Sequence, residues 1–69
     1  MRKYRELVEL KGLLREKKIT YEALAEKIKM SLSALSDKIN GKAVFDLIEA
    51  NKIIDLLEIP PQKINVYFF

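Results

Sequence analysis

The segment from Ile19 to Lys42, ITYEALAEKIKMSLSALSDKINGK, constrains the fold more than any other part of the chain. Thr20 and Ser31 favour the N-cap position of a helix, and each precedes apolar residues with helical spacing. Asn40-Gly41 is a typical helix end because both residues tolerate the left-handed conformation. The segment therefore predicts two helices of about nine residues each, joined by a turn of roughly three or four residues.

Apolar residues also recur at helical spacing on both sides of this segment. They predict a first helix over about residues 3–17 and a later helix over Leu47–Leu57. Asp46 and Glu49 form a capping-box pattern at the start of the later helix. Ile59-Pro60-Pro61 ends that helix, and the second proline suits the start of a fifth helical turn. The chain is thus predicted to be one all-α domain, residues 1–69, of four or five short helices.

The predicted core combines these apolar stripes. Ala25 is expected where the two central helices approach most closely, because a small side chain lets them cross. Gly12 lies in the first helix, at a cost of about 1 kcal/mol relative to Ala, and is expected to permit close approach of another helix. The residues expected to face inward are Tyr4, Leu7, Val8, Leu10, Leu13 and Leu14, then Ala23, Leu24, Ile28, Leu35 and Ile39, and finally Leu47, Ala50, Ile53, Ile54 and Leu57.

Composition excludes several classes of function. The sequence has no cysteine and no histidine, so disulfides, zinc sites and imidazole catalysis are not expected. Neither a paired-carboxylate cleft nor a Gly-rich phosphate loop is visible, and we expect no enzyme, metal or cofactor. No apolar run approaches the roughly 20 residues of a membrane span, and no signal region follows the N-terminus. We therefore expect a cytoplasmic protein without a membrane partner.

The charges are distributed unevenly along the chain. Residues 1–42 carry 11 Lys and Arg against 6 Asp and Glu, a net charge of +5. Residues 43–69 carry 2 against 4, a net charge of −2, so the whole chain is +3. This asymmetry is typical of a surface that binds a polyanion. An ordinary solvated surface explains it equally well, so charge alone does not decide between the two.

The segment resembles the helix-turn-helix proteins of the phage repressor/Cro type, also called the XRE family. The resembling residues are Ile19-Thr20-Tyr21-Glu22-Ala23-Leu24-Ala25, Met30-Ser31, Ala34-Leu35-Ser36 and Asn40-Gly41-Lys42. The resemblance implies a compact lambda-repressor-like domain, with a short hydrophobic C-terminal tail in this chain. The sequence also departs from the family pattern at three positions. The family usually has Gln where this chain has Tyr21, and it often has Gly where this chain has Lys18 and Lys29. Either those turns differ here, or a strained lysine is tolerated in exchange for phosphate contacts.

The resemblance implies a sequence-specific protein that binds double-stranded DNA through the second helix of the segment. Base contacts are expected from Leu32, Ser33, Ser36 and Asp37, and phosphate contacts from Tyr21, Lys29, Ser31, Lys38, Asn40 and Lys42. Each of these positions also has a competing interpretation without DNA. The alternatives are a solvated helix face, a partly buried edge, a helix cap or stop, and ordinary surface lysines. We expect a small phage-type transcriptional repressor that needs no small-molecule ligand.

The hydrophobic tail, residues 64–69, must be covered either by the first helix or by a second subunit. A homodimer on a palindromic operator is expected. The candidate interface comprises the outer side of the helix over Leu47–Leu57, with Ile59, Val66, Tyr67, Phe68 and Phe69. The alternative function is a protein-interaction module, similar to an antirepressor, that keeps the fold but does not bind DNA.

Overall fold

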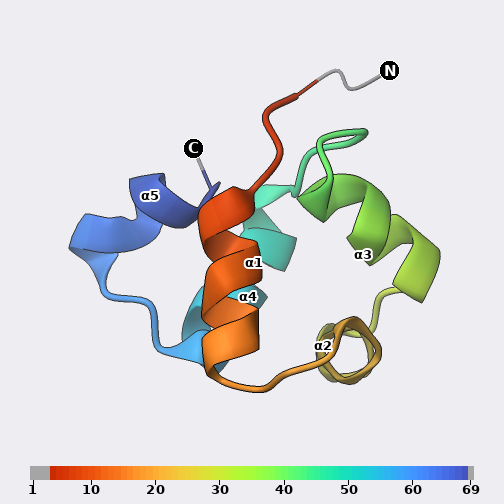
Figure 1. Cartoon of the computed structure of the whole chain (residues 1–69), viewed down its shortest axis with the longest axis horizontal. Coiled ribbons are helices and arrows are strands. Elements are labelled where there is room, and N and C mark those ends of the chain that lie inside the picture. Colours follow the sequence, from red (N-terminus) through yellow and green to blue (C-terminus); the bar gives the residue numbers. More distant parts are fainter. Residues whose placement is uncertain (1–3, 69) are drawn as a thin grey trace.

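The computed structural model describes residues 4–68, which form five α-helices and one 3₁₀ turn (Figure 1). In chain order the elements are α1 (Val8–Glu16), α2 (Tyr21–Ile28), α3 (Leu32–Ile39), α4 (Leu47–Leu57), η1 (Pro61–Lys63) and α5 (Ile64–Phe68). In Figure 1, α1 stands at the centre, with α2 and α3 on one side, α5 on the other and α4 behind. No strand occurs in the described residues, and the all-α prediction is confirmed.

Side-chain caps set the starts of the three middle helices. Thr20 and Ser31 each accept a hydrogen bond from the backbone N–H three residues later, both at 3.1 Å. Asp46 accepts from the backbone N–H of Glu49 at 2.7 Å, and the Glu49 carboxylate accepts from the Asp46 N–H at 3.0 Å. This reciprocal pair is the predicted capping box. Because caps are local interactions, the predicted starts of α2, α3 and α4 agree with the structure.

The first helix is shorter than predicted, because it begins at Val8 rather than near residue 3. The preceding residues bond instead to the end of α3: the Tyr4 N–H donates to the Gly41 carbonyl and the Leu7 N–H to the Ile39 carbonyl, both at 2.9 Å. Leu7 is buried as expected, whereas Tyr4 and Val8 are 49% and 60% exposed. The helical stripe was therefore wrong for these two residues. It was also wrong for Ala23 and Leu47, which are exposed although helical spacing predicted them to face inward.

Gly41 is a packing site as well as a helix stop. Its φ of +88° lies in the left-handed region, and an added Cβ would stand 2.5 Å from the carbonyl oxygen of Tyr4. Both observations require glycine at this position. Gly12, by contrast, would present its Cβ to open space, with nothing within 4 Å, so the close helix approach expected there is absent.

The core joins residues from all five helices. Those without exposed area are Leu10, Leu24, Leu35, Ile39 and Ile53. The tail forms α5 rather than an extended segment, and α5 packs against α1, so the chain covers its own tail. Ile59 and Phe68 are buried in this core, and the Phe68 ring meets the Phe45 ring edge-on at 5.8 Å. These two residues are therefore core residues and not parts of a dimer interface.

We expect Gly41→Ala to lower the free energy of unfolding by about 2–4 kcal/mol, because the left-handed strain and the overlap with Tyr4 add. Gly12→Ala should instead raise it by about 1 kcal/mol, since only helix propensity changes. Urea unfolding followed by circular dichroism measures both variants. Equal effects of the two substitutions would contradict the packing described for Gly41.

Candidate nucleic-acid interface

The helices α2 and α3 are connected by Lys29, Met30 and Ser31. Figure 1 looks along α2, whereas α3 runs across the view, so the two helices cross steeply. Ala25 is 4% exposed, and the N–H of Met30 donates to its carbonyl at 2.9 Å, which fixes the turn. The predicted small residue, Ala25, thus lies buried in the second half of α2, and its carbonyl is bonded to the turn that leads to α3.

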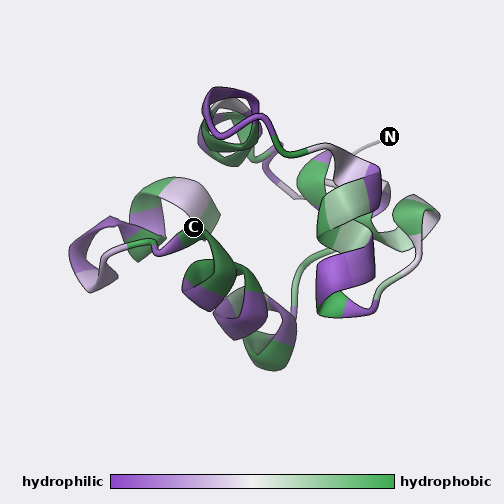
Figure 2. Ribbon diagram, turned by 90° about the horizontal axis from the view of Figure 1, so that it is seen from below, coloured by the Kyte–Doolittle hydropathy of each residue, from purple (hydrophilic) through white to green (hydrophobic). Residues whose placement is uncertain are grey.

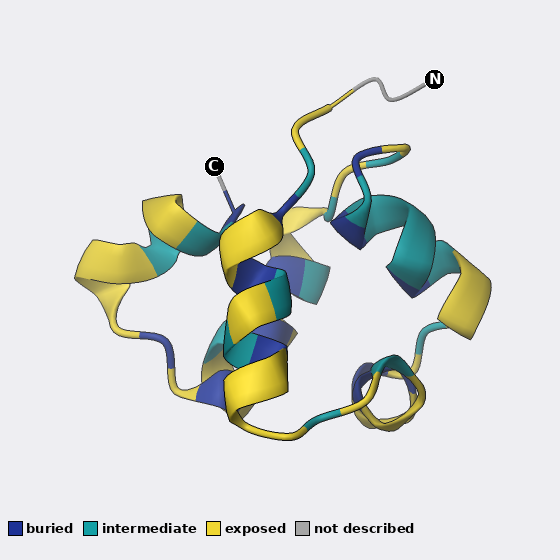
Figure 3. Cartoon of the chain, viewed as in Figure 1, coloured by how far each residue is buried: buried dark blue, intermediate teal, exposed yellow. Residues whose placement is uncertain are grey.

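The inner side of α3 is fully covered, since Leu35 and Ile39 have no exposed area. Its outer side begins with Leu32, which is 44% exposed, and Ser33, which is also exposed. Farther along, Ser36 and Asp37 are half-buried. Figure 3 shows this gradient, from an exposed N-terminal end of α3 to half-buried later turns. The four predicted base-contacting residues, Leu32, Ser33, Ser36 and Asp37, are therefore on one helix but unequally accessible.

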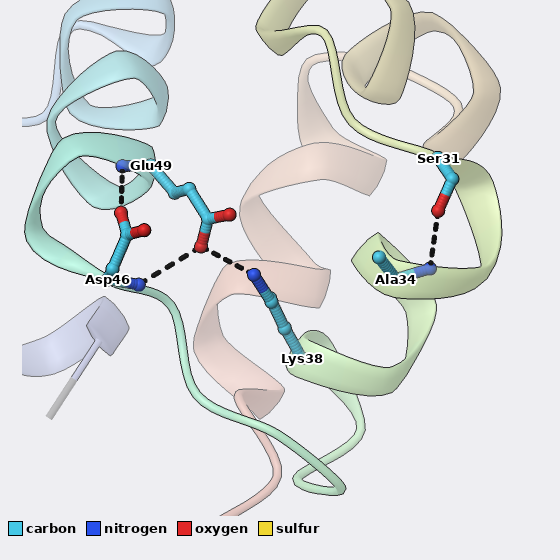
Figure 4. Close-up of polar contacts among 5 residues, drawn as sticks. All are labelled: Ser31, Ala34, Lys38, Asp46 and Glu49. Atoms are coloured by element: carbon cyan, nitrogen blue, oxygen red, sulfur yellow. Dashed lines mark hydrogen bonds and ion pairs between the residues drawn. The ribbon is translucent and has the colours of Figure 1, made fainter.

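Lys38 is directed away from the outer side of α3, which differs from its predicted role as a phosphate contact. Its Nζ lies 2.6 Å from Oε1 of Glu49, and the side chains of this pair are only 19% and 23% exposed (Figure 4). The same Glu49 oxygen accepts from Asp46, and the Lys38 Nζ lies 6.0 Å from the centre of the Phe45 ring. Lys38 therefore attaches α3 to α4, and its charge is neutralised there.

Lys29 and Lys42 lie just before and just after α3. Both are exposed, and among residues 4–68 neither takes part in an ion pair. The Lys42 N–H donates to the carbonyl of Asp37 at 2.8 Å, so the backbone at Lys42 is fixed to the last turns of α3. These two ammonium groups are available to an anion at opposite ends of the helix.

The other three predicted phosphate contacts have structural partners. Ser31 caps α3, and Asn40 donates from Nδ2 to the Ser36 hydroxyl at 3.2 Å. Tyr21 is half-buried and packs against the core. Their roles in phosphate binding stay predictions, and capping, helix-end bonding and packing account for their positions.

Lysine takes a left-handed conformation at the two turns where the phage repressor/Cro-type proteins, which the sequence resembles, often have glycine. Lys18 and Lys29 each have φ of 58°. The turns therefore keep the left-handed geometry and accept the strain of a residue with a side chain, which costs about 1–2 kcal/mol per residue. Of the two, only Lys29 adjoins α3.

Another group of lysines, besides those that flank α3, could not be detected from the sequence. Lys27 and Lys29 from α2 and its turn, with Lys52 and Asp55 from α4, line one shallow hollow. Lys52 is far along the chain from the other two, and no local pattern connects them. Only the packing of α2 against α4 brings them together.

The fold and the exposed side of α3 define a small all-α protein with a helix available to a partner. Residues 3–69 of the chain match the family described as "Protein of unknown function (DUF739)". The chain therefore belongs to that family. No curated protein matches the chain. Within residues 4–68, no group of three or more His, Cys, Asp or Glu is placed to hold a metal ion, and no helix is long and apolar enough to cross a bilayer.

We expect Lys18→Gly and Lys29→Gly each to raise the free energy of unfolding by about 0.5–1 kcal/mol, because glycine removes the left-handed strain. Lys17 is the matched control, since it is also a helix-ending lysine but has φ of −83°. Lys17→Gly should therefore destabilise the protein slightly. Thermal unfolding of the three variants gives the comparison, and stabilisation by Lys17→Gly would contradict the strain assigned to its neighbours.

Proposed function

We propose that this protein binds double-stranded DNA and places α3 in the major groove. The observation that carries the proposal is the asymmetry of α3, whose inner side is wholly buried while its N-terminal outer side, at Leu32 and Ser33, is exposed. Insertion of a helix into a groove requires that the helix keep a fixed orientation. Packing of its inner side against the core holds α3 in such an orientation and leaves its outer side free.

The dimensions and charges of α3 support this proposal. Its eight residues span about 12 Å, which is close to the width of the major groove. Lys29 and Lys42 lie at opposite ends of that length, where phosphates border the groove, and neither is neutralised by a carboxylate within residues 4–68. The net charge of +5 over residues 1–42 favours the same partner.

The chemistry of the exposed side chains fits the reading of base edges. The Ser33 hydroxyl can donate to or accept from several bases, and Leu32 can contact a thymine methyl group. The Asp37 carboxylate only accepts hydrogen bonds, so it suits a cytosine amino group. Its negative charge disfavours any arrangement close to a phosphate. Since Asp37 is half-buried, it contributes less than Ser33 in this proposal.

The resemblance to phage repressor/Cro-type proteins extends the proposal to a small transcriptional repressor. The crossing of α2 and α3, and the buried Ala25 before the turn that joins them, support that resemblance. A repressor of this kind blocks a promoter by occupying an operator, and a symmetric site would require two copies of α3 about 34 Å apart.

Phosphate contact predicts a specific salt dependence. Affinity for a mixed pool of duplex DNA should fall steeply between about 50 mM and about 200 mM salt, as counterions compete. Lys42→Ala should weaken binding to all sequences alike and reduce the slope of log affinity against log salt by about 1. Lys63→Ala is the matched control, because Lys63 is exposed but lies on η1. Fluorescence anisotropy titrations measure both slopes.

The absence of salt-sensitive binding by the unaltered protein would contradict the proposed function and favour the protein-interaction module. The half-buried carboxylate of Asp37 on α3 is the observation that supports this second candidate, since it repels phosphate. Equal slope changes for Lys42→Ala and Lys63→Ala would place the DNA on another surface.

Base readout predicts a position-specific effect at Ser33. In-vitro selection of bound duplexes should yield a preferred sequence, and Ser33→Ala should relax the preference at one base position with a loss of about 1–3 kcal/mol there. The exposed Glu22 in the first turn of α2 gives a control, because Glu22→Gln should leave the preferred sequence unchanged. A uniform loss of affinity for Ser33→Ala would show that Ser33 positions the helix instead.

A further inference from the structure

An apolar patch lies outside the proposed DNA-binding surface, at the start of α4. It consists of Val44, Leu47 and Ile48, which are 56%, 76% and 69% exposed. Viewed from below, the apolar beginning of α4 is at the edge of the molecule, on the side opposite α1 (Figure 2). Charged or polar residues would serve equally well in the first turn of a surface helix, so this exposure requires an explanation.

The patch borders an apolar pocket of about 240 Å³. Val44 lines this pocket together with Phe45, Ala50 and Phe68, and Tyr4 and Leu7 line it from the N-terminal segment. Leu47 precedes Ala50 by three residues and therefore lies on the same side of α4 as the pocket. Val44 and Leu47 thus lie on the side of the pocket, and Ile48, the next residue after Leu47, extends the exposed apolar surface around the start of α4.

The area of this surface suits association of two copies. Each of the three patch residues is more than half exposed, and adjacent apolar side chains of this kind approach the roughly 300–600 Å² of the largest patch on a typical monomer. Two such patches, with Tyr4 and a polar rim, reach the roughly 1,000 Å² that a specific interface needs. A domain of 69 residues has a small core, so burying this surface would also add stability.

The charges around the patch favour a second copy over a strongly charged partner. Arg5 lines the pocket and Asp46 caps α4 beside the patch, whereas Lys38 and Glu49 neutralise each other, so the rim offers one cation and one carboxylate. Within residues 4–68 the Arg5 guanidinium forms no ion pair, and the exposed Asp46 carboxylate bonds only to the Glu49 N–H. A twofold axis that places the Arg5 of one copy against the Asp46 of the other also forms the reverse pair, so this pairing would be self-complementary.

We propose that two copies of this chain associate through Val44, Leu47 and Ile48, with the Arg5 of each copy directed toward the Asp46 of the other. This assignment narrows the predicted interface to the start of α4, because the other candidates Ile59 and Phe68 are buried and Tyr67 packs against the core. Of the predicted tail residues that the structure describes, only Val66 is largely exposed, at 47%; Phe69 lies outside the described residues.

Dimer formation at this patch leaves the outer side of α3 free. Lys38, which lines the pocket, is five residues beyond Ser33 and is therefore rotated from it by about 140° around the helix. The two surfaces use different sides of α3, so association and DNA binding are compatible but independent. The proposed dimer can accordingly be tested without DNA.

Sedimentation velocity of the full chain, from micromolar to millimolar concentration and without DNA, tests this proposal. The unaltered 8.0 kDa chain should shift from monomer to dimer as the concentration rises. Leu47→Lys should weaken association by about 30-fold or more, because a charge then lies in the apolar centre of the interface. Ile48→Lys is a second, independent variant, and circular dichroism should show unchanged helix content for both, since both side chains are exposed.

Val66→Lys is the matched control, because it places the same charge on another exposed apolar residue, and it should leave dimerisation unchanged. A monomer at every concentration would overturn the proposal. So would dimerisation that survives both Leu47→Lys and Ile48→Lys, or dimerisation that Val66→Lys abolishes. Because no DNA is present, each of these results is distinguishable from a failure of the proposed DNA binding.

Discussion

The structure depends on the contact between the N-terminal segment and the end of α3. The N–H groups of Tyr4 and Leu7 donate to the carbonyls of Gly41 and Ile39, and Gly41 has no room for a side chain against Tyr4. These bonds satisfy carbonyls that a helix end would otherwise leave unpaired. They also fix the C-terminal end of α3 against the segment that begins α1, so the buried Leu35 and Ile39 hold α3 in one orientation.

Features that depend on neighbouring residues could be predicted from the sequence, whereas those that depend on tertiary contacts could not. The N-caps Thr20 and Ser31 and the capping box of α4 gave correct helix starts because each interaction spans three residues. The start of α1 was wrong, since residues before Val8 bond to a distant helix end. For the same reason, the helical pattern could not show that Lys38 pairs with Glu49.

We assign different roles to the two sides of α3. Its outer side, with Ser33 most accessible, is proposed to contact DNA, and the inner side attaches to α4 through Lys38 and Glu49. That attachment places the first turn of α4 beside the end of α3, where the proposed dimer surface begins. The left-handed Lys29 fits this division, because the strained turn places its cation just before α3, where we propose a phosphate contact.

The central claim is that α3 and its flanking lysines form the DNA-binding surface. The most direct measurement is the change in backbone amide NMR shifts as duplex DNA is added at low salt. The account predicts that the largest shift changes fall within residues 29–42, with much smaller changes in α5. The absence of shift changes, or changes centred on α5 or η1, would contradict it.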